Sequence, residues 1–140
     1  MKQKFFDLNI DTNGQKLYEF TDQIIYFIKE NNFKNGILNL NIQHTSASLI
    51  VQENADPDVQ TDLIKYFDKL VPMDEKLYIH TTEGKDDMPA HIKSALTNNQ
   101  ISLSVKDSQI LLGTWQGIYL FEHRLVPSKR IITHHFIGEN

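Results

Sequence analysis

The first third of the chain alternates between segments with a strand period and segments with a helix period. Loose alternation over residues 4–11 predicts a strand that ends at the turn signal Asn13-Gly14. Strict alternation over residues 37–44 predicts a half-buried strand with His44 on its apolar face. The apolar positions between them follow a helical period and predict one helix; they are Leu17, Phe20, Ile24, Phe27 and Ile28.

The middle of the chain predicts two short strands and two helices. The strands cover residues 49–51 and 77–80, and the second ends in a histidine. Asp56-Pro57 supplies a helix cap followed by proline at the first helical position, which predicts a helix to about Leu70. Asp86-Asp87 ahead of Pro89 predicts a further capped helix, to about residue 96.

The last third is dominated by strands. Residues 101–105 and 110–112 predict a hairpin, and further strands are expected over 118–124 and 130–137. The whole pattern predicts an α+β fold in one domain over residues 1–140. Its mixed or mostly antiparallel sheet has six to seven strands, with about three helices packed against it.

Composition narrows the classes of function. A formal charge of −4 argues against a nucleic-acid partner, which would require an excess of Lys and Arg. No apolar run approaches the ~18 residues of a membrane span, and the N-terminus lacks a signal peptide, so a cytoplasmic location without a membrane partner is expected. The chain has no cysteine, so any metal must be held by imidazole and oxygen.

Histidines recur at the ends of predicted strands or in the first turn of a predicted helix. These are His44, His80, His91 and His123. Since strand ends gather at one edge of a sheet, convergence of at least three of them in one site is a reasonable hypothesis. The alternative is that each is a hydrogen-bonded core histidine. His134 and His135 lie on opposite faces of the last strand and are expected to be structural.

The segment from His80 to His91 is the richest in metal-binding side chains. It holds two histidines with Glu83, Asp86 and Asp87 in twelve residues. A histidine-dominated site favours zinc, whereas a carboxylate-dominated one favours magnesium or manganese, and the pattern does not choose between them. Alternatively, the aspartates only cap the helix.

Three further motifs carry polar chemistry. The hydroxyl-rich turn of residues 44–48 favours anion binding by its N–H and O–H groups over serine nucleophilic catalysis, because no nucleophile elbow is present. Residues 113–117 place two glycines around the only tryptophan, which predicts close approach of a ligand, a neighbouring subunit or a packed strand. Glu122-His123-Arg124 offers an acid/base pair and a guanidinium suited to phosphate or carboxylate, or else an exposed salt bridge.

Several of these segments together resemble a known family. They are His44-Thr45-Ser46-Ala47, Glu53-Asn54-Ala55-Asp56-Pro57-Asp58-Val59, Glu83-Gly84, Asp87-Met88-Pro89-Ala90-His91-Ile92-Lys93, Leu112-Gly113-Thr114-Trp115-Gln116-Gly117-Ile118 and Glu122-His123-Arg124. In this order they are similar to the YjbQ-like family of secondary thiamine-phosphate synthase enzymes. The resemblance implies an α+β domain that assembles as a homotrimer. It also implies a histidine-containing pocket near the subunit interface, often with a bound metal.

Site roles follow from these motifs and from the resemblance. Catalytic roles are expected for His44, His91, His123, Glu53 and Arg124. The expected ligands of a divalent metal, zinc or magnesium, are His80, His91, His44 and Asp87. Ligand-binding roles are expected for Thr45, Ser46, Thr114 and Gln116.

Two functions fit this site. The first is a metal-dependent enzyme that acts on a small phosphorylated metabolite. The resemblance implies a thiamine-phosphate synthase reaction, which joins a hydroxymethylpyrimidine diphosphate to a thiazole phosphate and releases pyrophosphate. The second is a non-catalytic, trimeric metal- or metabolite-binding module.

Overall fold

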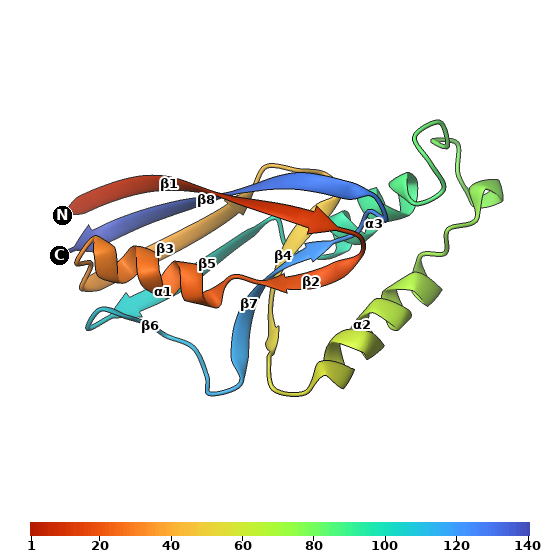
Figure 1. Ribbon diagram of the computed structural model, residues 1–140. Helices are drawn as coiled ribbons and strands as arrows, with labels where there is room; N and C mark the ends of the chain where they lie inside the picture. Colours follow the sequence, from red (N-terminus) through yellow and green to blue (C-terminus); the bar gives the residue numbers. More distant parts are fainter.

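The computed structural model describes every residue from 1 to 140 and contains eight strands, three α-helices and one single-turn 3₁₀ helix (Figure 1). The strands are β1 (Lys2–Asn13), β2 (Lys16–Glu19), β3 (Asn35–Ile42), β4 (Ala47–Glu53), β5 (Gln100–Lys106), β6 (Gln109–Ile110), β7 (Gln116–Glu122) and β8 (Pro127–Glu139). The helices are α1 (Thr21–Glu30), α2 (Pro57–Leu70) and α3 (Asp87–Leu96), with the 3₁₀ helix at Glu75–Leu77.

The strands form two antiparallel sheets that share their connections. The larger sheet has the order β1-β8-β3-β5-β6, and the smaller has the order β2-β7-β4. The chain passes directly from a strand of one sheet to a strand of the other at four places, namely from β1 to β2, β3 to β4, β6 to β7 and β7 to β8. The β1–β2 corner contains Gly14 with a φ of +92°, a conformation that favours glycine. The short connections at these corners hold the two sheets together.

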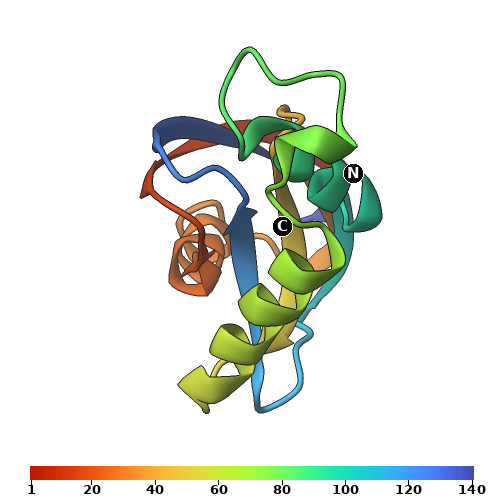
Figure 2. The same cartoon turned by 90° about the vertical axis from the view of Figure 1, so that its right-hand side faces the viewer.

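Helices cover one face of each sheet. The strand period of β3 turns Leu38, Leu40 and Ile42 toward α1, whose own apolar stripe meets them in the main core. On the smaller sheet, Leu63, Ile64 and Phe67 of α2 pack against Leu17, Tyr119 and Phe121. Figure 2 shows α1 and α2 on opposite sides of β7. None of the helices has the length and apolar character that crossing a bilayer requires.

The α+β class is confirmed, but the strands divide into two sheets, not one. Leu17 was expected in a helix and lies instead in β2, where it pairs with Phe121 of β7, because its apolar spacing suits both elements. The strand expected over 77–80 is wrong. The Asp74 side chain accepts from the backbone N–H of Lys76 and starts a 3₁₀ turn there instead.

α3 and the loop before it lie at one end of the molecule, and the two chain termini lie at the other (Figure 1). The hydroxyl of Ser94 on α3 donates to the backbone oxygen of Ala47, which fixes the helix against the start of β4. The predicted bounds of α3 are confirmed, but Asp86 makes no capping hydrogen bond to it. Its carboxylate therefore has another role.

Candidate metal centre

Four side chains from one segment converge at the start of α3. His80 and Glu83 lie in the preceding loop, and Asp87 and His91 lie one turn apart on the helix. One potential ligand atom from each lies within 4.8 Å of the other three. Tetrahedral zinc holds its nitrogen and oxygen ligands roughly 3.5 Å apart, so small side-chain movements would close this group around an ion.

Asp87 lies at the middle of the group. Its Oδ2 is 2.7 Å from His80 Nε2 and 3.1 Å from His91 Nε2. Glu83 Oε2 is 3.1 Å from the same His80 nitrogen. Asp87 is buried, whereas Glu83 and His80 are more exposed, so the group opens to solvent on the loop side.

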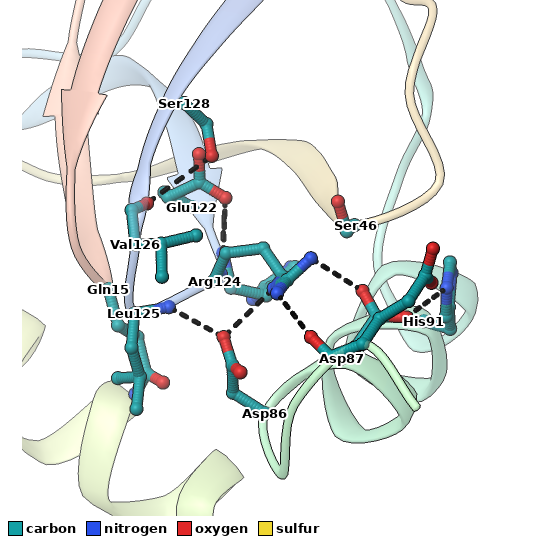
Figure 3. Close-up of polar contacts among 12 residues, drawn as sticks. Gln15, Ser46, Asp86, Asp87, His91, Glu122, Arg124, Leu125, Val126 and Ser128 are labelled. Atoms are coloured by element: carbon teal, nitrogen blue, oxygen red, sulfur yellow. Dashed lines mark hydrogen bonds and ion pairs between the residues drawn. The ribbon is translucent and has the colours of Figure 1, made fainter. Parts of the chain in front are cut away.

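The other oxygen of Asp87 is held by Arg124, two residues after the end of β7. Arg124 Nη1 donates to Asp87 Oδ1 over 2.7 Å, and Nε donates to Asp86 Oδ2 over 2.9 Å. Nη2 donates to the backbone oxygen of Glu83, and the backbone N–H of Leu125 also donates to Asp86 (Figure 3). The guanidinium therefore fixes the aspartates with Asp87 Oδ2 turned toward the histidines, as an outer-shell partner of a metal ligand does.

The electrostatics of the group favour a cation. Burial alone would raise the pKa of Asp87, but the hydrogen bond with His80 and the charges of His91 and Arg124 bring it below its ordinary value. The hydrogen bond with Asp87 raises the pKa of His80. Three carboxylates face one guanidinium here, so at formal charges the group without its histidines carries −2 (three negative, one positive).

The tautomer of His91 is set by the backbone. Its Nδ1 lies 2.9 Å from the carbonyl oxygen of Thr45, which only accepts, so Nδ1 carries a proton and donates it. In the neutral ring, Nε2 then presents a lone pair toward the ionised Asp87. That 3.1 Å contact is favourable when a second proton or a metal ion lies between the two atoms.

His44 lies next to this group but not in it. Its Nε2 accepts a hydrogen bond of 3.0 Å from the backbone N–H of Ile131. Together with Thr45, His91 and neighbouring residues it lines a cavity of about 330 Å³. A larger cavity of about 570 Å³ lies beside Met1 and Glu139 at the termini, and Glu139 is its only ionisable side chain.

The hydroxyl-rich turn of residues 44–48 is bound by an arginine side chain of the protein itself. Arg130 Nη2 donates to the backbone oxygen and the hydroxyl of Ser46. The same guanidinium pairs with the fully buried Glu122. Ser46 therefore presents its oxygens to an internal cation, where the sequence predicts donors for an anion.

His123 lies in the interior. Its side chain is fully buried, and Nε2 is 2.8 Å from the hydroxyl of Ser48. Burial, together with the charges of Lys93 and Arg130, lowers the pKa of His123 from 6.5 to about 3. The ring is therefore neutral at physiological pH, and its position in the interior beside Ser48 keeps it out of the group around Asp87.

Three more predicted site residues lie at the far end of the smaller sheet. Glu53 ends β4 and pairs with Gln116 at the start of β7, and Thr114 lies two residues before it. Six residues of strand, roughly 20 Å, separate Glu53 from Ala47 at the end near α3. Within one chain, these side chains do not reach the group around Asp87.

Glu83 belongs to the group although it was not among the expected metal ligands. Its position three residues after His80 is the signal that could have identified it. Lys93 has an internal role, because its ammonium is buried and lies 2.6 Å from Asp68 Oδ1 on α2.

Comparisons with known proteins extend over nearly the whole chain. The family model described as UPF0047 protein YjbQ-like matches residues 6–139. A UPF0047 protein of Synechocystis sp. is 48% identical over 132 residues, covering 94% of this chain and 90% of the relative. The UPF0047 protein YjbQ of Escherichia coli O157:H7 is 42% identical over 138 residues, covering 98% of each chain.

Solved structures share the fold. A YjbQ/UPF0047-family protein of Clostridium acetobutylicum superposes with a TM-score of 0.86 at 28% identity, over 94% of this chain and 99% of that chain. A YbjQ-like protein of unknown function from Sulfolobus solfataricus gives 0.85 at 21% identity, over 99% and 100%. The second match shows the fold alone.

Proposed function

The chain belongs to the UPF0047 YjbQ-like family, and we propose that it is a metal-dependent enzyme centred on His80, Asp87 and His91. The observation that carries this proposal is the contact of both imidazoles with one buried carboxylate oxygen. His91 Nδ1 donates its proton to the carbonyl oxygen of Thr45, so Nε2 is left to act as a metal ligand. A mixed imidazole and carboxylate set fits zinc better than magnesium, which prefers oxygen alone.

Each residue of the centre has a distinct task in this proposal. His80, Asp87 and His91 hold the ion, and Arg124 keeps the Asp87 carboxylate oriented. Glu83 is the most exposed member of the group, so it is placed to accept a proton from a water or a substrate hydroxyl. The metal, when bound, supplies a Lewis acid that neutralises phosphoryl oxygens.

The substrate proposed is a small phosphorylated metabolite, with the thiamine precursors as the first pair to test. Zinc-loaded or magnesium-loaded protein should convert them, and the His91→Ala variant should not. Equal turnover by both proteins would refute the assigned role. A bound metal without turnover on any phosphorylated candidate would favour the non-catalytic module.

One observation supports that second function. Both arginines nearest the turn and the metal group are bound to carboxylates, Arg124 to Asp86 and Asp87, and Arg130 to Glu122. Neither has the free guanidinium that phosphate recognition uses. A metal- or metabolite-binding module needs no such cation.

Metal binding itself is tested by titration of the metal-free protein with zinc. We expect one ion per chain, and we expect Asp87→Asn to weaken binding by more than about 100-fold. Asp86→Asn is the matched control, because it removes the same charge one residue away but leaves all proposed ligands in place. Equal affinities of the two variants would exclude Asp87 as a ligand.

We also propose that the protein assembles as a homotrimer, as the family resemblance implies. In support, the outer face of the larger sheet exposes Phe5, Ile37, Ile131 and Ile137, and no helix covers it. Light scattering coupled to gel filtration gives the mass directly. A monomer or dimer at micromolar concentration would refute the trimer.

A further inference from the structure

The cavity beside His91 has an uncharged, polar wall. Seven residues line its volume of about 330 Å³, and apart from the two histidines none is ionisable. At about 30 Å³ per water molecule this volume corresponds to roughly ten waters, so it suits a ligand of about that many heavy atoms. His91 belongs both to this wall and to the metal-binding group.

His44 lines this cavity and has a hydrogen-bond donor that no other residue of the chain takes up. The backbone N–H of Ile131 only donates, so Nε2 of His44 accepts and carries no proton. The neutral ring therefore carries its proton on Nδ1, and this nitrogen has no hydrogen-bond partner within the chain. His91 has the same tautomer, but its Nδ1–H is already bound to Thr45. Of the two rings, only His44 has a donor left for a ligand.

Some of the remaining polar groups of the wall already form hydrogen bonds within the chain, and others do not. The hydroxyl of Ser94 donates to Ala47, and that of Thr97 is bound to Ser48 and to the backbone of Lys93. The hydroxyl of Thr45 and the side-chain amide of Asn99 have no partner in the chain and are exposed. A bound molecule would therefore meet an imidazole N–H, a hydroxyl and a carboxamide.

We propose that this cavity binds an uncharged small molecule that carries hydroxyl or carbonyl oxygens, oriented by the Nδ1–H of His44. A phosphate group would find no cation here, whereas a polyol or amide finds both donors and acceptors. The proposal rests on the proposed metal centre in one respect: because His91 belongs to both sites, the bound molecule would lie next to the metal ion.

The test uses two variants of His44 that separate its two nitrogens. His44→Asn places an amide nitrogen near the position of Nδ1 and loses the acceptor for Ile131. His44→Gln places its amide near Nε2, keeps an acceptor for that backbone N–H, and loses the donor at Nδ1. The probes are erythritol, D-ribose and acetamide, with inorganic phosphate and acetate as anionic counterparts. Binding is followed on the Asn99 side-chain amide in ¹H–¹⁵N spectra of full-length, metal-free protein.

We expect uncharged probes to shift the Asn99 signal saturably and His44→Asn to retain this response. His44→Gln should bind the same probes about fivefold to tenfold more weakly, the value of one hydrogen bond to an uncharged group. Long-range ¹⁵N spectra should show the proton of His44 on Nδ1. A proton on Nε2, tighter binding of phosphate than of every uncharged probe, or no shift with any uncharged probe would each overturn the proposal.

The proposed metal centre is tested independently of the proposed cavity ligand. Zinc titration is read on the ring nitrogens of His80, which belongs to the group around Asp87 and does not line the cavity. Probe binding without zinc binding would leave the cavity site standing and refute the metal centre. Zinc binding without probe binding would do the reverse.

Discussion

Neutral, buried His123 should make the fold less stable as the pH falls from about 7 to about 5. Its pKa is lowered from 6.5 to about 3, chiefly by burial, so the folded state does not bind a proton in this range. The unfolded chain titrates near 6.5 and does bind one. Because only the unfolded state gains a proton between these two pKa values, stability falls as the pH falls through this window.

The size of the effect follows from the two pKa values. Each pH unit below 6.5 costs about 1.4 kcal/mol of unfolding free energy until the folded ring also titrates near pH 3. At about pH 5 the loss from this residue alone is therefore about 2 kcal/mol. His44 and His134 also have pKa values lowered by burial, and they act in the same direction. A difference between variants is needed to isolate His123.

Urea unfolding of wild type and His123→Gln at both pH values, with a chelator present, provides that difference. Glutamine does not titrate, so the variant should lose about 2 kcal/mol less than wild type between the two conditions. Ser48→Ala is the control, because it removes the 2.8 Å partner of His123 but leaves the titrating ring. It should lose about 1 kcal/mol at both pH values and keep the pH dependence. The same pH dependence in wild type and His123→Gln would refute the reasoning, as would an NMR titration of folded His123 near its ordinary pKa.

Further expectations concern the charged groups around α3. Arg124→Lys should lower zinc affinity by about 10- to 100-fold in calorimetric titrations, since a single ammonium cannot hold two aspartates and a carbonyl at once. Zinc affinity should decrease as the pH is lowered, because Asp87 raises the pKa of His80 and a proton then competes with the metal for that nitrogen. An affinity independent of pH would exclude His80 as a ligand. Asp68→Asn should destabilise the protein in urea by about 3 kcal/mol, and Lys93→Met by less, since only the first leaves a buried charge without its partner; the reverse order would contradict this account.

Elements set by local signals could be predicted from the sequence. Helix α2 begins at Pro57 after Asp56, whose side chain accepts from the N–H of Asp58, as its capping pattern predicts. The alternation of β3 also predicts its buried face, and His134 and His135 lie on opposite faces of β8 as expected, with His134 the buried one. Leu17 could not be placed in this way, because only its pairing with β7 selects a strand there.

In the candidate site, too, some residues could be predicted from local sequence signals and others depend on tertiary contacts. His80, Asp87 and His91 come from one twelve-residue segment, so helical spacing alone brings two of them together and a short loop adds the third. Arg124 comes from a distant part of the sequence, the connection between β7 and β8, and contacts this group through Asp87. The sequence left open whether its guanidinium would bind a phosphate or carboxylate ligand or form a salt bridge, and no local pattern identifies Asp86 and Asp87 as its partners.

By itself, the sequence determined the α+β class, the bounds of two helices and the concentration of potential metal ligands in the segment from His80 to His91. These depend on capping, periodicity and side-chain chemistry within a few residues. Only the tertiary structure decided which histidines belong to the site. His44 and His123 both follow strands, but the backbone of Ile131 takes Nε2 of the first, and the second turns into the core beside Ser48. Strand register and the direction of the chain after each strand are set by contacts across the fold, which no local pattern encodes.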